Sequence, residues 1–324
     1  LAGLANLEMP EALMSGGSDF SVAFQAGEGV RLSVMSDLVG LESSVPVPFT
    51  KARDVPQPLR FDLNMSDTPE AVVRYGNALT GYGLLKSEGW SMIAEVGVDS
   101  GVGLAAASVV PANTLQISGG LDELDLAAWT GTLDRLNLSN TGNDFTTQWS
   151  EVEIDRLALG PGQLVDVVTS GQFNGEKLEV AVESGFVSGT AMYSGDAHSI
   201  SLQIDTLDLD QLPDFNIDAL SAYADSEAVK NVIEEGEEKA NGADLPPISA
   251  EIAALLFEGE SLGSIGFELD ASPDAVSLVG VTGVIDGVTF GLGNEFAWTL
   301  GETPSTSASI NLQLGSSDST LSTV

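Results

Sequence analysis

The stretch KLEVAVE, Lys177–Glu183, alternates between apolar residues and mostly charged ones. Successive side chains of a β-strand point to opposite faces, so this period of two predicts a strand with one apolar and one polar face. The same period recurs in VRLSV, LRFDLNM, ISLQI, IGFEL and INLQL. Together these stretches predict an all-β chain whose apolar strand faces are formed by Val30, Leu32, Val34, Leu59, Phe61, Leu63, Leu178, Val180, Val182, Ile200, Leu202, Ile204, Ile265, Phe267, Leu269, Ile310, Leu312 and Leu314.

Departures from this period are few. In VEIDRLAL, residues 152–159, the apolar positions change phase, which predicts a β-bulge near Arg156. The stretch DLAAWTGTLDRL places its apolar residues on one helical face, which predicts a short helix near 125–136. Asp125 is expected to cap the first turn of that helix, since a carboxylate there can accept an otherwise unpaired backbone N–H.

The pattern also divides the chain into three expected parts. A strand region at 1–224 is followed by a helix and an acidic linker at 225–247, and then by a second strand region at 248–324. An internal repeat at constant spacing is expected to reuse one strand-turn-strand unit. Its residues are Glu153, Ile154, Leu157, Leu164, Gly185 and Gly189, which recur as Glu251, Ile252, Leu255, Leu262, Gly283 and Gly287.

The apolar strand faces must be buried, and the chain offers little helix to cover them. Two sheets could face each other and enclose a dry core, as in a sandwich or barrel. Alternatively, one curled sheet could form a trough that shelters another molecule. Aliphatic residues suit both arrangements, and aromatics make up only 6% of the chain, so the residues alone leave the choice open.

The charge and the scarce reactive residues exclude several classes of site. A net charge of −37 argues against a nucleic-acid partner, because such a surface repels phosphates. The chain has no cysteine and one histidine, His198, which disfavours zinc and a Ser-His-Asp site. The aspartates of DTLDLDQLPD lack the spacing of a calcium loop. We therefore expect no metal, no cofactor and no enzymatic activity. An acidic extracellular hydrolase, which would use a pair of carboxylates, is kept as the least favoured alternative.

The ends of the chain suggest a portion of a longer protein. Residue 1 is leucine, and we find no signal-peptide pattern. The longest apolar stretch, GVGLAAASVVPA at 101–112, is too short to span a bilayer. Any membrane anchor is therefore expected outside this sequence.

The stretch LSVMSDLVGLESSVPVPFTKARDVPQPLRFDL, Leu32–Leu63, resembles a segment of the YhdP proteins of Gram-negative bacteria, which belong to the AsmA-like group. An alternating strand is followed by Ser-x-Leu-x-Gly-Leu, a bend with two prolines and a lysine, and Pro-Leu before the next strand. Val45 stands where the family more often has leucine, and the acidic insert at 225–244 has no counterpart. The matching positions are Ser36, Leu38, Gly40, Leu41, Pro46, Pro48, Lys51, Pro58 and Leu59, then Gly120, Leu121, Leu124, Asp125, Leu126 and Trp129, and finally Leu262, Gly263 and Trp298.

The resemblance implies an elongated, curled antiparallel β-sheet that forms a U-shaped groove, with one or two short helices. It further implies a periplasmic lipid-conduit segment that moves phospholipid between the inner and outer membranes. The partners would be phospholipid acyl chains, the apolar strand residues above would line the groove, and an inner-membrane anchor would lie outside this chain. The alternative is a structural or adhesive surface protein, a β-sandwich or solenoid without lipid cargo.

In the groove interpretation, Leu38–Phe49 is expected to fold over the rim. Pro46 and Pro48 cannot donate ladder hydrogen bonds, so they belong at an edge or bend rather than inside a sheet. An ordinary proline-rich connection between two strands would account for the same residues.

Overall fold

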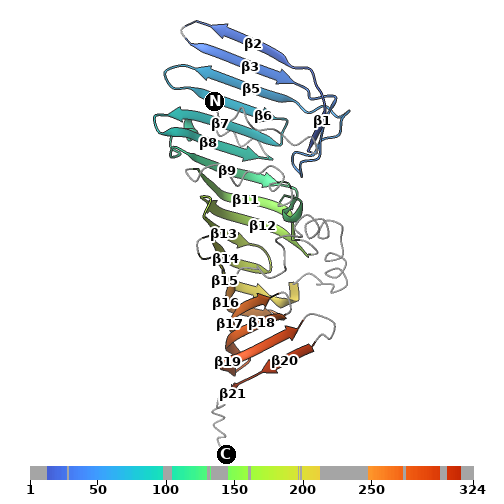
Figure 1. Ribbon diagram of the computed structural model, residues 1–324, viewed down its shortest axis with the longest axis vertical. Coiled ribbons are helices and arrows are strands. Elements are labelled where there is room, and N and C mark those ends of the chain that lie inside the picture. Colours follow the sequence, from blue (N-terminus) through green and yellow to red (C-terminus); the bar gives the residue numbers. More distant parts are fainter. Residues whose placement is uncertain are drawn as a thin grey trace, which may run out of the picture. The chain divides into compact units, whose positions relative to one another are not determined.

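The structure, a computed structural model, describes residues 13–27, 29–97, 104–129, 132, 145–159, 162–195, 197, 199–211, 247–272, 275–299 and 305–314. The chain divides into two compact units, unit 1 (Leu1–Glu176) and unit 2 (Lys177–Val324). Figure 1 shows that each is built almost entirely of strands, which confirms the all-β class. Apart from Pro247, the helix and linker expected at 225–247 lie outside the described residues, and the three-part division stays a prediction.

Unit 1 holds one large sheet and one small one. In the large sheet, each strand pairs with the next one named. Its strands are β2 (Ser21–Ala26), β3 (Val30–Ser36), β5 (Leu59–Met65), β6 (Glu70–Tyr75), β7 (Leu79–Lys86), β8 (Gly89–Val96), β9 (Thr114–Leu121), β11 (Thr146–Leu159) and β12 (Gly162–Phe173), with β10 (Leu124–Asp125) beside β11. The small sheet pairs β1 (Met14–Gly16) with β4 (Leu41–Ser43).

In unit 2 the strands also follow one another in chain order. They are β13 (Lys177–Glu183), β14 (Val187–Ser194), β15 (Ser199–Asp208), β16 (Ile248–Phe257), β17 (Glu260–Ser272), β18 (Ala275–Ile285) and β19 (Val288–Thr299). At the end of this order, β19 pairs at different points with both β20 (Ser305–Ser309) and β21 (Leu312–Leu314).

Most strand pairs are antiparallel, as expected for the curled sheet, and a few are parallel. The pairs β8–β9, β9–β11 and β15–β16 are parallel. A parallel neighbour requires a crossover, because the chain must return to the same end of the sheet before it re-enters. The first crossover contains α1 (Leu104–Ala107), the second the helical residues Leu126–Trp129 and Thr132, and the third begins with the 3-10 helix η2 (Leu209–Gln211).

The second crossover confirms the short helix predicted near 125–136, at the positions that the structure describes. The backbone N–H of Ala128 donates to Asp125 Oδ1 at 3.0 Å, so Asp125 caps the helix as expected. The Thr132 hydroxyl donates to the carbonyl of Ala128 at 2.8 Å, one turn back.

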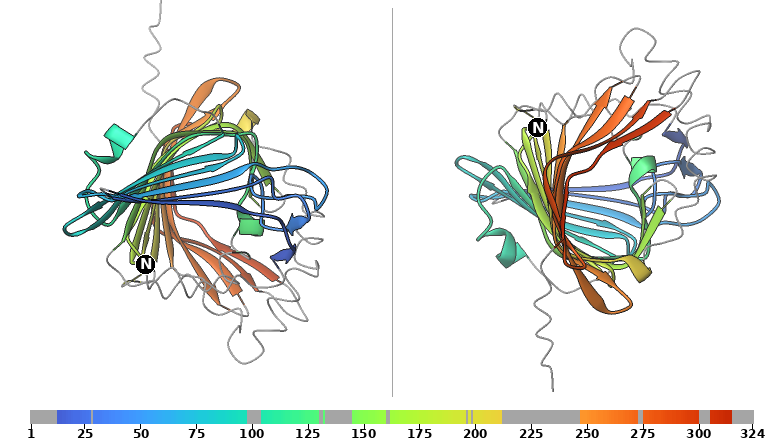
Figure 2. Two further views of the ribbon diagram at one scale, coloured as in Figure 1. Left: turned by 90° about the horizontal axis from the view of Figure 1, so that it is seen from above. Right: turned by 90° about the horizontal axis from the view of Figure 1, so that it is seen from below.

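The first crossover was not predicted as a helix, and it covers one face of the sheet of unit 1. Ala107 and Val110 pack against Leu84 of β7 and Ile93 of β8 in a buried cluster. Figure 2 shows α1 on the outer side of the curled strands of this unit and the helix at Leu126–Trp129 on their inner side. The two crossovers therefore lie on opposite faces.

The internal repeat is visible in the structure. The hairpin β11–β12 follows a crossover and enters parallel to its neighbour, and so does the hairpin β16–β17. Ile154 pairs with Val167 in the first hairpin, as Ile252 pairs with Ile265 in the second. The repeated glycines are less equivalent. Gly185 follows β13, whereas its counterpart Gly283 lies inside the longer β18.

The bulge predicted near Arg156 is misplaced. Pairing between β11 and β12 is regular from Val152 to Leu159, and the register shift lies earlier, between Trp149 and Val152. Glu151 has a φ of 50° there, a left-handed conformation that absorbs the extra residue. The phase change in the sequence was real, but alternation alone did not show which residue leaves the ladder.

A buried amide joins the last strands of unit 2. Asn294 is fully buried where β19 stops pairing with β20 and where the β18–β19 register shifts. Its Nδ2 donates to the carbonyls of Val281 at 3.0 Å and Gly291 at 2.8 Å. Its Oδ1 accepts from the backbone N–H of Asn311. The side chain thus replaces ladder hydrogen bonds that the irregular backbone cannot make.

We predict that Asn294→Ala lowers the free energy of unfolding by about 2–4 kcal/mol, because three backbone groups lose their partner in a dry site. Urea denaturation followed by circular dichroism measures this. The matched control is Ala substitution of the exposed neighbour Glu295, which we expect to change stability by less than about 0.5 kcal/mol. Equal effects of the two substitutions would contradict this role of Asn294.

Candidate functional site: an apolar sheet face

In unit 2, apolar side chains line up across the strands, because residues paired in register lie on the same face of a sheet. We call the face that carries Leu178, Val180 and Val182 the apolar face of unit 2. One row on it joins Leu178, Tyr193, Ile200, Ile248, Leu269, Leu278, Phe296 and Ala308. Another joins Val182, Gly189, Ile204, Ile252, Ile265, Gly283, Phe290 and Leu312.

Unit 1 has an equivalent surface, which we call the apolar face of unit 1. It carries Leu32 and Val34 of β3, which pair with Leu63 and Phe61 of β5. One row runs from β2 to β12 through Val22, Val34, Phe61, Val73, Gly81, Ala94, Ile117, Trp149 and Gly171.

The structure places the predicted lining residues on these two faces, with one correction. Ile310 lies between β20 and β21 rather than in a strand, because β21 begins only at Leu312. Leu314 pairs with Val288 in the ladder. The others belong to β3, β5, β13, β15, β17 and β21, in the phase that the sequence indicated. That these residues contact a ligand stays a prediction.

The exposure of these side chains separates an open face from a packed core. Apart from Leu314, whose side chain lies outside the described set, all the predicted lining residues are half-buried or exposed, and Leu312 is 50% exposed. The inward side chains of a β-sandwich would be buried by the facing sheet. Exceptions lie in the middle of the β11–β12 hairpin, where Val152, Ile154 and Val167 are buried. In β16, Ala250 and Ile252 are buried as well. Over most of their area the apolar faces are therefore accessible.

The opposite face of unit 1 is polar at β3 and β5, where it carries Arg31, Ser33, Arg60 and Asp62. A hollow of about 390 Å³ on it is lined by side chains that include Arg31, Arg60, Asp62 and Glu70. Arg60 Nε donates to Asp62 Oδ2 and the Ser33 hydroxyl to Asp62 Oδ1, both at 2.6 Å. The hydrogen bond from Arg60 lowers the pKa of Asp62 most, and the bond from Ser33 adds to this effect, so the pKa of Asp62 lies below its usual range. A general acid needs a raised pKa, so this hollow does not support the hydrolase interpretation.

The proline bend crosses onto the apolar face of unit 1. The ring of Phe49 lies 5.8 Å from that of Tyr75, which ends β6 on this face, and 5.9 Å from the indole of Trp129. Trp129 Nε1 donates to the carbonyl of Val47 at 3.0 Å. Burial raises the pKa of Tyr75. The bend and the second crossover therefore meet beside Tyr75. That Leu38–Phe49 folds over the rim of a groove stays a prediction.

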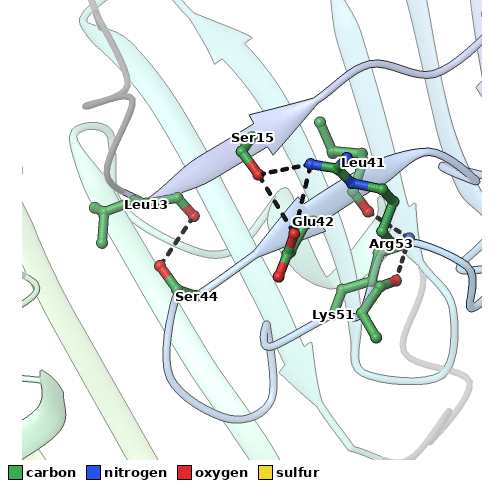
Figure 3. A network of polar contacts seen from close by, with 8 residues as sticks. Leu13, Ser15, Leu41, Glu42, Ser44, Lys51 and Arg53 are labelled. Atoms are coloured by element: carbon green, nitrogen blue, oxygen red, sulfur yellow. Dashed lines mark hydrogen bonds and ion pairs between the residues drawn. The ribbon is translucent and has the colours of Figure 1, made fainter.

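The base of the bend is held by many polar contacts, several of which Figure 3 shows. Lys51 is buried, and its Nζ donates to the carbonyl of Leu41 at 2.7 Å and to that of Ala52 at 2.9 Å. Ser43 and Lys51 exchange two backbone hydrogen bonds at 2.9 and 3.0 Å. Arg53 Nη2 lies 3.6 Å from Glu42 Oε2. The role of this base is structural, because its lysine is buried and donates to backbone carbonyls.

The arrangement is thus an accessible apolar surface, repeated over many strands, and spanned at one point by an aromatic cluster. The chain matches the protein family described as "YhdP protein" over residues 4–324. This chain belongs to the YhdP family. No curated protein and no solved structure matches it.

Membership of the YhdP family indicates bridge-like lipid transport in general and association with the cell envelope, and the family is not known as enzymatic. Such transport needs apolar surface rather than a catalytic cluster, which fits the two faces. Within the part of the chain that the structure describes, no helix has the length and apolar character that a membrane crossing requires.

Sequence reasoning missed the aromatic cluster as a unit. It singled out the bend and Trp129 separately, and Phe49 and Tyr75 were assigned no role. Two signals were available in the sequence. Phe49 is an aromatic residue directly after the prolines of PVPF, and Tyr75 is the last of the alternating apolar residues in AVVRY. Neither signal shows that residues so distant in sequence meet.

Gly40 supplies a test of the base of the bend. It has a φ of +95°, and a Cβ there would lie 2.3 Å from the carbonyl oxygen of Gly17. We predict that Gly40→Ala destabilises the bend by about 1–3 kcal/mol, through backbone strain and this clash. Limited proteolysis of the folded protein would show faster cleavage near the bend. Gly17→Ala is the matched control, because a Cβ at Gly17 meets nothing within 4 Å.

Asp62 predicts a pH effect. Since its folded pKa is lowered, the carboxylate contributes stability above its unfolded pKa, and this contribution is lost as pH falls through the lower folded value. The melting temperature of Asp62→Asn should therefore lie below that of the wild type at neutral pH, and the gap should narrow in acid. Asp67→Asn, in the exposed turn before β6, is the control. A gap that is constant with pH would contradict the effect.

Proposed function

We propose that the apolar faces of the two units bind the acyl chains of phospholipids, and that the chain is a segment of a periplasmic conduit between the inner and outer membranes. The observation that carries the proposal is the combination of continuous apolar rows with half-exposed side chains. Exposed apolar surface of this extent marks a site for another apolar molecule. The family, whose members act in lipid transport, favours hydrocarbon as that molecule.

The energetics suit transport rather than storage. Moving an acyl chain of about 16 methylenes from water to an apolar face is favourable by roughly 13 kcal/mol, at about 0.8 kcal/mol per methylene. The free energy that the acyl chain loses on leaving a bilayer is about equal to the free energy that it gains on binding the apolar face. The net transfer from membrane to protein is therefore close to zero, and a lipid can slide along similar rows without a deep trap.

The repeated rows supply the uniformity that sliding requires. Leu202 has Ala191 and Ala250 as its neighbours across the strands, and Val180 lies one strand beyond Ala191. A chain crossing this row meets aliphatic surface at each step. The outward positions of the same strands carry Glu179, Gln203 and Glu251, which are exposed and keep the other face in water.

The test is lipid retention. The protein is purified from cell envelopes, and an organic extract is analysed for phospholipid by mass spectrometry. We predict that wild type retains phospholipid and that Leu202→Glu retains about tenfold less at this position, because a carboxylate displaces roughly two methylene contacts. The matched control is Gln203→Glu, which places the same charge on the next residue, facing away from the apolar face.

Two outcomes would overturn the proposal. One is an absence of phospholipid from the wild-type extract under conditions in which vesicle lipids are detected. The other is unfolding of Leu202→Glu with normal folding of Gln203→Glu and no lipid in either. That result would mean that Leu202 packs against protein, as in a closed sandwich.

A further inference from the structure

The bend over unit 1 is held very differently at its base and at its tip. At the base, Lys51 binds two carbonyls, Ser43 exchanges two backbone hydrogen bonds with it, and Gly40 N–H donates to the carbonyl of Arg53 at 2.8 Å. At the tip, the bend meets the second crossover through the Phe49–Trp129 ring contact and the Trp129–Val47 hydrogen bond. The base is thus a fixed anchor, and the tip is held by few contacts.

The tip is also the more exposed part. Val47 is 44% exposed, whereas Lys51 is 5% exposed. The two ring centroids are 5.9 Å apart with planes at 83°, an edge-to-face contact that forms and breaks without disturbing a packed core. Beneath them lies Tyr75, on the apolar face. The segment therefore has the form of a strap with an anchored base and a tip that is latched to Trp129.

We propose that the bend and the helical residues Leu126–Trp129 form a clasp over the apolar face of unit 1, and that opening of the Phe49–Trp129 latch controls the sideways entry of hydrocarbon onto this face. The inference rests on the proposed function, because it assigns a gate to the same surface. When the latch is closed, a lipid can reach Tyr75 only along the rows. When it is open, a lipid can also enter from the side.

The clasp can be tested first without any lipid. The chain has no cysteine, so a single cysteine introduced as Tyr75→Cys is the only thiol. Its reaction rate with a water-soluble maleimide reports how often the clasp opens. We expect the rate to rise about tenfold when Trp129→Ala is added, because both the ring contact and the hydrogen bond are lost. Trp129→Phe keeps a ring and should give an intermediate rate.

A cysteine at Val109, which is 83% exposed on the first crossover, is the control and should react at the same rate in both backgrounds. Circular dichroism and the melting temperature of each variant show whether the sheet is intact. Equal reaction rates of Tyr75→Cys with and without Trp129 in folded proteins would overturn the clasp, whatever the lipid result.

The second experiment locks the clasp. Cysteines introduced as Val47→Cys and Ala128→Cys flank the latch, and a flexible bismaleimide joins them across it. Uptake of a fluorescent phospholipid from phosphatidylethanolamine and phosphatidylglycerol vesicles is then followed in time. We expect the locked protein to take up lipid at least about fivefold more slowly than the unlinked double variant, with the same final amount, because the rows remain continuous.

The outcomes separate the two ideas. If the unlinked protein takes up lipid and the linked protein does so at the same rate, the clasp does not gate entry, and the proposed function stands. If neither takes up lipid although the wild-type fold is intact, the proposed function fails and the gating role fails with it. Slower uptake in the linked protein alone supports the clasp.

Discussion

The ladder of backbone hydrogen bonds is the interaction on which this structure depends. Because every strand inside a sheet satisfies its N–H and C=O groups through its neighbours, the sheet does not need a second layer to hold its backbone. That frees one face from packing, and apolar side chains such as Val180 and Leu202 remain accessible. Where the ladder becomes irregular, the molecule repairs it with a side chain, as Asn294 does between β18, β19 and Asn311. Among the residues that the structure describes, helix covers the sheet at particular sites, such as α1 over Leu84 and Ile93. An uncovered apolar face is the consequence, and lipid binding is what such a face can offer.

The sequence predicted the local parts of the fold well, because a period of two is written into neighbouring residues. The bounds of Leu59–Met65 and Lys177–Glu183 matched the structure at both ends. The parallel pairs could not be read in this way, since a crossover is defined by where the chain returns and not by its own residues. The same limit explains why α1 was not predicted as a helix, since its alanines indicated only an apolar stretch. It also explains Arg156, where the phase change was visible but the left-handed residue, Glu151, was not.

In the candidate site too, the sequence predicted the local features and missed the contacts between distant residues. Alternation predicted which side chains share a face, and the ladder register places Leu32 with Leu63 and Val34 with Phe61 accordingly. Ile310 was expected inside a strand, but it lies before β21, next to Asn311, whose backbone N–H donates to Asn294 Oδ1 instead of to a neighbouring strand. No local pattern connects Asn311 with Asn294. The aromatic cluster is beyond sequence reasoning for the same reason. Phe49, Tyr75 and Trp129 come from three separate segments, and only the folded sheet brings them together.

The repeated hairpin has an evolutionary consequence. Because β11 and β16 both enter parallel to the preceding strand, a duplicated block from one crossover to the next rejoins the ladder in phase. Each added block of five strands, equivalent to β11 to β15, would lengthen such a sheet by about 24 Å, at roughly 4.8 Å per strand, and would leave the existing side-chain rows undisturbed. Duplication of this block in the gene can therefore change the length of the protein in fixed steps. Such steps could fit the length of the protein to the width of a cell envelope.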